Sequence, residues 1–117
     1  MPRTITDPPK DPVELTATLR ERSREAPVLV VKLSPICPVS HFAESNYRDW
    51  LSGLAPETPL QTLEIDVIAE KPTARGLTAE LGIRHESPQA LLFRDGELVW
   101  HDSHDGVNAD NLSEALG

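Results

Sequence analysis

Hydrophobic residues along the chain follow two kinds of spacing, one typical of strands and one typical of helices. Four short stretches have strand character, either as a β-branched apolar run or as apolar and polar residues in alternation. These stretches are residues 28–33, 63–67, 90–93 and 98–100. The run Val28–Leu33 is apolar at nearly every position, which predicts a strand buried on both faces. The last two stretches flank Asp95-Gly96, a pair typical of the tip of a β-hairpin.

Between these strands the apolar residues lie three or four positions apart, which predicts helices. Helices are expected to begin after Asp11, after Cys37, near Glu70 and after Asn108, where capping residues or a first-turn proline stand. Gly82 is expected to end the third helix. A glycine inside that helix, Gly76, should weaken it by roughly 1 kcal/mol relative to alanine.

The order of elements is helix, strand, helix, strand, helix, strand, strand, helix. The early strand–helix–strand unit should be parallel and right-handed, and the final pair of strands antiparallel. A four-stranded mixed sheet with helices on both faces satisfies both conditions, and this α/β arrangement is the thioredoxin architecture. In that architecture the loop after the first strand and the loop before the hairpin meet at one edge, which places Pro88 opposite Cys37.

Length, charge and composition narrow the classes of function. The 117 residues suit one domain, expected over residues 11–117, preceded by a flexible, proline-rich arm over residues 1–10. The net charge of −8 argues against nucleic acid as a partner, because phosphate binding needs a basic face. No apolar run approaches the length that spans a membrane, and a single cysteine excludes an intramolecular disulfide. We therefore expect no membrane association and a cytoplasmic protein.

Cys37 is the residue best placed for chemistry. It lies between a predicted strand and a predicted helix, and Pro38 makes it the N-cap of that helix. Backbone N–H groups and the helix dipole stabilise a thiolate at this position, so the sulfur is expected to be a nucleophile. The alternative is a small hydrophobic side chain packed under the turn. The flanking prolines and the strand–helix context favour the reactive thiol.

With these residues in place, the chain resembles the YtxJ family of thioredoxin-like proteins, the monothiol bacilliredoxins. The resemblance runs from Val28 to the C-terminus. The matching stretches are Cys37-Pro38-Val39-Ser40, Asp66-Val67-Ile68, residues 81–90 with His85-Glu86-Ser87-Pro88-Gln89, and residues 95–101 ending in Trp100-His101. The resemblance implies a cis Ser87-Pro88 bond facing the thiol, which would expose the Ser87 backbone to an incoming disulfide.

The resemblance also implies an activity, which is removal of bacillithiol from S-bacillithiolated proteins with Cys37 as the nucleophile. Bacillithiol, a small thiol bearing a malate and a glucosamine, is then an external co-substrate, and no bound cofactor or metal is expected. Ser40 stands where dithiol redox proteins carry their second cysteine. The expected substrate-binding residues are Pro38, Val39, Ser40, Ser87 and Pro88. Donors for the malate stay open among the N–H groups of Val39 and Ser40, the Ser87 backbone, Arg84 and Lys32.

Two histidines, His41 and His85, are candidates for tuning the thiol. The run His101–Asp105 suggests a metal cluster at first sight, but it has no second cluster to complete a four-ligand site, which favours a solvated loop. Three other functions are compatible with a single cysteine on this fold. A peroxidase lacks its usual motif here, whereas an iron–sulfur carrier of the monothiol glutaredoxin kind and a binding module without chemistry remain alternatives.

Overall fold

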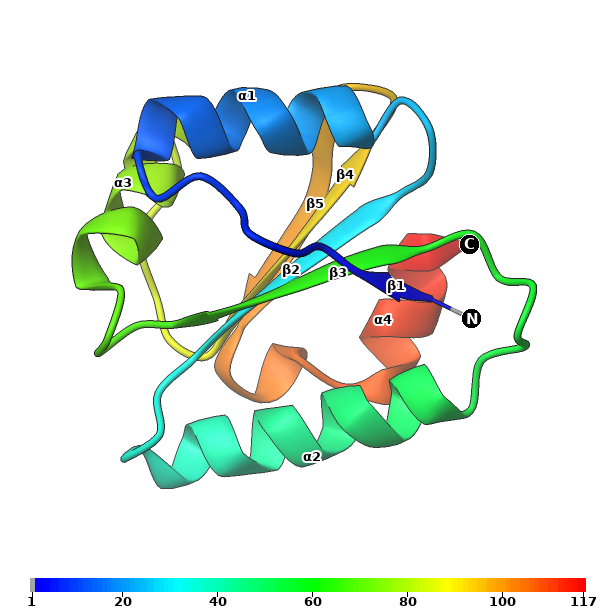
Figure 1. The fold of residues 1–117 in the computed structure, drawn as a ribbon. Coiled ribbons are helices and arrows are strands. Elements are labelled where there is room, and N and C mark those ends of the chain that lie inside the picture. The colour runs from blue at the N-terminus through cyan, green and yellow to red at the C-terminus, as the bar shows by residue number, and fades with distance from the viewer. Residues whose placement is uncertain (1) are drawn as a thin grey trace.

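The computed structural model describes residues 2–117; Met1, part of the expected arm, lies outside the described residues. The chain forms an α/β sandwich around one mixed sheet (Figure 1). In chain order its elements are β1 (Arg3–Thr4), α1 (Pro12–Arg22), β2 (Val28–Leu33), α2 (Pro38–Ser52), β3 (Gln61–Asp66), α3 (Lys71–Leu81), β4 (Gln89–Arg94), β5 (Glu97–Ser103), the 3-10 turn η1 (His104–Gly106) and α4 (Ala109–Leu116).

The sheet has the strand order β1-β3-β2-β4-β5. The strands β2 and β3 are parallel, whereas β4 pairs antiparallel with both β2 and β5, as predicted. Helices α1 and α3 cover one face of the sheet, and α2 and α4 cover the other (Figure 1). Each face carries its own hydrophobic cluster, and β2 contributes to both because it is buried along its whole length.

The prediction of four strands is wrong by one, because the N-terminal segment adds β1. Arg3 and Thr4 pair in parallel with Gln61 and Thr62 at the start of β3. Ile5 follows, and it is only 6% exposed within the cluster under α1 and α3. These residues are therefore docked rather than part of a flexible arm. A two-residue strand next to one isolated apolar residue is too short to produce a readable periodicity.

Two strands, β3 and β5, extend at one end by two residues or more beyond the predicted stretches. The strand β3 begins at Gln61 instead of residue 63, because β1 and β2 pair with it on both sides there and bury its polar start. The strand β5 runs to Ser103, into the segment expected as a loop, and Ser103 pairs with Gln89. Hydrogen bonding with a neighbouring strand, rather than hydrophobicity, determines where β3 begins and where β5 ends.

Helix boundaries follow the capping signals. Asp11 accepts a hydrogen bond from the Glu14 backbone N–H, 3.0 Å away, and so caps α1. Gly82 ends α3 with a left-handed backbone, φ +71°. Gly76 has a packing role that the sequence did not indicate: a Cβ built there would lie 2.2 Å from Cγ of Pro12. The missing side chain lets α1 and α3 pack closely.

Candidate functional site

The strand β2 carries the chain to the site, and Cys37 follows it as the N-cap of α2. Its backbone is extended, with φ −101° and ψ 122°, and its carbonyl accepts the first helical hydrogen bond, from the N–H of His41 at 3.2 Å. Pro38 occupies the first turn, as predicted. The thiol is free and half-buried. The sulfur therefore stands at the positive end of a helix of 15 residues and remains accessible to a reagent.

Ser40, which stands where dithiol redox proteins have a second cysteine, has a structural task. Its side chain is 1% exposed, and its hydroxyl oxygen accepts a hydrogen bond from the Ser34 backbone N–H at 3.0 Å. This bond ties the end of β2 to the first turn of α2. The hydrogen bond therefore joins the residue at the start of the turn that carries Cys37 to the residue at its end.

The peptide bond between Ser87 and Pro88 is cis, the isomer that the family resemblance implies. Pro88 is buried just before β4, and Ser87 lines the same cleft as Cys37. The Ser87 Oγ atom is itself buried and has no hydrogen-bond partner within residues 2–117. A buried hydroxyl without a partner is unfavourable, so the loop before β4 leaves one hydrogen bond unmade beside the cleft.

The cleft that joins these residues has a volume of about 420 Å³, within the range of roughly 300–1,000 Å³ that is typical of small-molecule sites. Its lining comes from the start of α2, the end of β3, the first turns of α3 and the loop before β4. The lining residues are Ser34, Cys37, Val67, Ile68, Lys71, Arg75, His85 and Ser87. Three of them are basic and none is acidic, although the whole chain carries a net charge of −8.

A buried polar network lies behind His85. Lys32, in the central strand β2, is 0% exposed. Its Nζ atom lies 2.7 Å from His85 Nδ1 and 2.8 Å from the Gln89 Oε1 that accepts from it. Gln89 Nε2 in turn donates to the Arg84 carbonyl, 2.9 Å away, and Gln89 Oε1 also accepts from the Glu86 N–H at 3.2 Å. The network fastens the loop of residues 84–88 to the sheet.

Burial sets the protonation of this network. Burial, together with the nearby charge of Arg75, lowers the pKa of Lys32 from 10.5 to about 8. Burial and then the Lys32 charge also lower the pKa of His85 below its usual range, which keeps the imidazole neutral at neutral pH. Since an ammonium group only donates, His85 Nδ1 accepts from Lys32, and the ring proton lies on Nε2. His85 is therefore a hydrogen-bond donor in the cleft.

Other residues singled out from the sequence lie outside the cleft. Val39 and His41 are exposed on the first turn of α2 and are not part of the cleft lining. Lys32, considered as a malate donor, is fully buried and already bonded to His85 and Gln89, so it does not reach the cleft itself. Arg84 is exposed but does not line the cleft either.

The remaining motif residues have structural positions. His101 belongs to β5 and His104 begins η1, and within residues 2–117 no group of three or more metal-ligating side chains gathers. Trp50 is buried and donates to Ser113 Oγ at 2.9 Å, and Trp100 packs against the same cluster. Trp50 is thus a core residue, and Trp100 is partly buried against the core.

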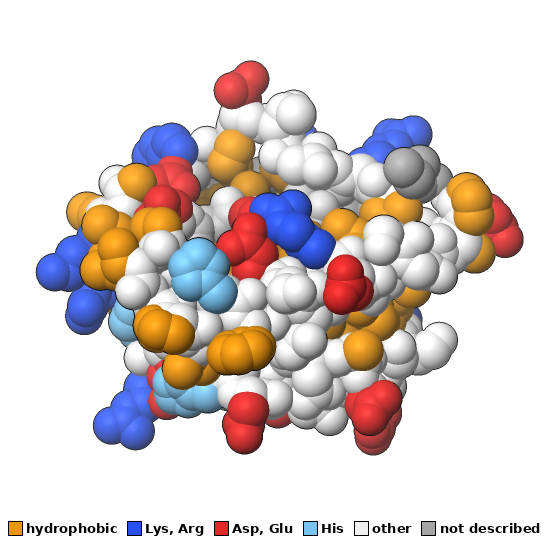
Figure 2. Space-filling view, turned by 90° about the horizontal axis from the view of Figure 1, so that it is seen from below, with side chains coloured by type: hydrophobic (Ala, Val, Ile, Leu, Met, Phe, Trp, Pro, Cys, Tyr) orange, Lys and Arg blue, Asp and Glu red, His pale blue; other side chains and the backbone are white. Residues whose placement is uncertain are grey.

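An apolar rim, made up of Ile36, Phe42 and Ile68, lies on the segments that lead into and out of the cleft. Ile36, the residue before Cys37, is 78% exposed, Phe42 on α2 is 75% exposed, and Ile68 after β3 is 56% exposed. Figure 2 shows hydrophobic side chains gathered at the end of the molecule where α2 begins. Exposed apolar groups around a reactive centre are typical of a surface that contacts other proteins.

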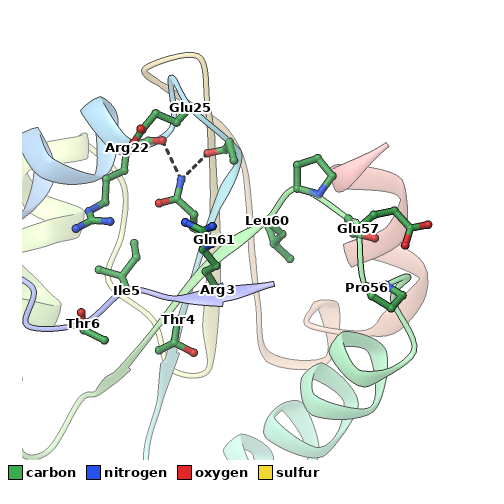
Figure 3. A pocket seen from close by; sticks show the side chains of 13 residues that line it. Arg3, Thr4, Ile5, Thr6, Arg22, Glu25, Pro56, Glu57, Leu60 and Gln61 are labelled. Carbon is green, nitrogen blue, oxygen red and sulfur yellow. Dashed lines mark hydrogen bonds between the residues drawn. The ribbon is translucent and has the colours of Figure 1, made fainter. Parts of the chain in front are cut away.

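A larger cavity, of about 720 Å³, lies at the opposite end of the sheet, where β2 and β3 begin (Figure 3). Its wall includes Arg3, Glu57 and Gln61. Gln61 Nε2 donates to the carbonyls of Arg22 and Ala26, at 2.9 and 3.0 Å, so its amide supports the chain between α1 and β2. Cys37, the single cysteine of the chain, lines the other cleft, so any thiol chemistry belongs there.

Sequence reasoning missed Lys71, Arg75 and the bridging role of Gln89. The signal for the first two is their spacing of four positions on a predicted helix, which puts them on one face. The direction of that face depends on how α3 packs on the sheet. Lys32 had a clearer signal, since it is the one charged residue in an otherwise apolar strand.

None of the helices described in residues 2–117 is both long enough and apolar enough to cross a membrane.

The fold is shared with thioredoxins. A protein described as a candidate oxidoreductase with a thioredoxin fold is 24% identical, with 98% of this chain and 93% of that chain covered and a TM-score of 0.74. Thioredoxin from Malassezia sympodialis is 13% identical over 99% and 88% of the chains, with a TM-score of 0.66. Desulfothioredoxin from Desulfovibrio vulgaris Hildenborough is 20% identical over 97% and 93%, with a TM-score of 0.62.

The structural relatives establish the fold, and the family follows from the sequence motifs around the cleft. A family model described as monothiol bacilliredoxin BrxC matches residues 11–112, which span Cys37, the cis Ser87-Pro88 bond and the basic wall of the cleft. The match agrees with one cysteine at the start of α2 and a serine in place of the second. The chain belongs to the monothiol bacilliredoxin BrxC family, on a thioredoxin fold.

Proposed function

We propose that this protein removes bacillithiol from S-bacillithiolated proteins. The Cys37 thiolate attacks the bacillithiol sulfur of the mixed disulfide. A bond forms between Cys37 Sγ and that sulfur, the original S–S bond breaks, and the freed protein leaves as a thiolate that takes up a proton from water. Cys37 then carries bacillithiol as a mixed disulfide.

One observation carries this proposal: a half-buried, free thiol at a helix N-terminus shares one cleft with Ser87 and its cis bond to Pro88. The backbone beside such a bond can pair with an extended chain, which would align an incoming disulfide with the sulfur. The apolar rim of Ile36, Phe42 and Ile68 offers contact area for a protein substrate. Family membership supports the same chemistry.

Turnover requires a second thiol from outside. Ser40 cannot resolve the mixed disulfide, and no other cysteine is present. A second bacillithiol, as thiolate, attacks the bacillithiol sulfur bound to Cys37. This releases the Cys37 thiolate together with the disulfide of bacillithiol, so that electrons balance over the cycle.

The test uses a model protein whose single cysteine carries bacillithiol. The wild-type protein should release the reduced substrate and gain the mass of one bacillithiol, whereas Cys37→Ser should do neither. Equal rates for the two proteins would end the proposal. An absorption spectrum of protein purified without oxygen tests the iron–sulfur alternative in the same preparation.

A further inference from the structure

Two cations on α3 face the cleft of Cys37. Lys71 and Arg75 are four residues apart, so they lie on one side of the helix, and both line the cleft. Cys37 stands on the wall that α2 contributes, and α2 and α3 lie on opposite faces of the sheet (Figure 1). The sulfur and the two cations are therefore on different walls of one cleft.

These cations have no ion-pair partner in the part of the chain that the structure describes. Its four ion pairs join Lys10 to Glu70, Arg24 to Glu21, and Arg48 to both Glu44 and Glu64. The carboxylates closest in sequence to the cleft are already engaged. Glu70 pairs with Lys10, the Asp66 carboxylate accepts from the N–H groups of Ile68 and Ala69, and Glu86 accepts from the Ser103 hydroxyl.

Most lysine and arginine side chains among residues 2–117 form no ion pair, since only Lys10, Arg24 and Arg48 do. Lys71 and Arg75 stand out because they line the same cleft, and that lining contains no carboxylate to offset their charge. Two adjacent cations beside a cleft without carboxylates raise the local potential, and Arg75 lowers the pKa of both Lys32 and His85 by its charge. An anion placed there would relieve the repulsion among these groups.

We propose that Lys71 and Arg75 form a dicarboxylate-binding subsite, which holds the malate of bacillithiol while its sulfur is bonded to Cys37. This inference rests on the proposed function and adds a recognition site to it. The malate and the thiol are separate substituents of the sugar in bacillithiol, so the carboxylates can contact another wall of the cleft while the sulfur is bonded to Cys37. Arginine binds a carboxylate through two parallel N–H groups, and lysine adds a point charge for the second one.

The cleft provides two neutral groups for the rest of the ligand. His85 and Ser87 line the cleft together with the cations. Neither carries a charge at neutral pH, which suits the hydroxyl groups of a sugar. Dicarboxylate recognition by α3 and hydrogen bonding by the loop before β4 would together distinguish bacillithiol from thiols without an acidic end.

The experiment compares two mixed disulfides of the same model protein, one with bacillithiol and one with 2-mercaptoethanol, which has no carboxylate. The double variant Lys71→Gln/Arg75→Gln should lower kcat/KM for the bacillithiol substrate about tenfold more than for the other, as expected for loss of charge-assisted hydrogen bonds in a solvated cleft. Arg3→Gln, which removes a cation from the cavity of Figure 3, is the matched control and should leave the ratio unchanged.

A second measurement does not depend on bacillithiol. L-malate, at fixed ionic strength, should slow alkylation of Cys37 by iodoacetamide in a saturable way in the wild type and in Arg3→Gln, but not in the double variant. Protection by malate without reduction of the bacillithiol substrate would refute the proposed function and leave the subsite standing. If the double variant reduces both substrates with the kcat/KM values of the wild type, the ratio between them is unchanged and the subsite alone is refuted. If kcat/KM falls equally for both substrates, the cations bind carboxylates of the protein substrate instead of the malate, and the inference is overturned.

Discussion

Replacement of Lys32 by methionine should change how stability depends on pH. Lys32 is fully buried in β2, and its two side-chain partners, His85 and Gln89, are neutral. No carboxylate bonds to it, so the interior disfavours the ammonium form and lowers the pKa to about 8. Methionine fills a similar volume without the charge.

The magnitude follows from the two pKa values. Lys32 titrates near 8 in the folded protein and near 10.5 when it is unfolded. Between these values the unfolded chain holds a proton that the folded chain has lost, so the free energy of unfolding rises with pH. Each unit of difference is worth about 1.4 kcal/mol, and integration from about pH 7 to about pH 9.5 gives a rise of about 2 kcal/mol.

Urea denaturation of both proteins at several pH values in this range measures the effect. The difference in unfolding free energy between wild type and Lys32→Met removes the contributions of other titrating groups. That difference should shift by about 2 kcal/mol in favour of the wild type as pH rises. Lys71→Met, which removes an exposed lysine, separates burial from the loss of a charge. Parallel pH profiles for wild type and Lys32→Met would refute the reasoning.

Three further substitutions test the fold and the site. Gly76→Ala should destabilise the protein by about 1–3 kcal/mol in urea denaturation despite its better helix propensity, because the new Cβ meets Pro12; an increase in stability would contradict the close packing of α1 and α3. Gly82→Ala should cost about 1 kcal/mol, since alanine is strained at φ +71°, and an unchanged unfolding free energy would show that the cap adapts. Ser40→Cys should convert the adduct on Cys37 into an intramolecular disulfide that intact-mass analysis detects; persistence of the bacillithiol adduct would argue against the alignment of these two positions.

Local signals in the sequence were sufficient for most of the fold. Asp11 and Gly82 set helix boundaries through hydrogen bonds and backbone freedom that act over a few residues, and Asp95-Gly96 set the hairpin in the same way. The strand β1 escaped prediction because its two residues are placed by pairing with β3, a partner almost sixty residues away. The role of Gly76 escaped for the same reason, since Pro12 on another helix determines it.

The residues of the site also differ in whether a local signal or a long-range contact determines their role. Cys37 could be predicted from its own neighbourhood, whereas the cis bond from Ser87 to Pro88 was expected only from the family resemblance, and the order of strands brings the two together. The basic wall could not be predicted, because spacing puts Lys71 and Arg75 on one side of α3 without giving the direction of that side. Their function depends on what they face, and only the packed helix defines that.

Local charge, rather than the total, decides what the cleft attracts. A protein of net charge −8 should on average repel an anionic thiol. At physiological ionic strength, however, charges are screened beyond about 8 Å, so a ligand in the cleft interacts mainly with the groups that line it. Those groups are Lys71, Arg75 and the neutral His85, with the Lys32 ammonium behind them. Acidic residues elsewhere on the surface are screened from such a ligand, so the proposed attraction to Lys71 and Arg75 is compatible with the negative charge of the whole chain.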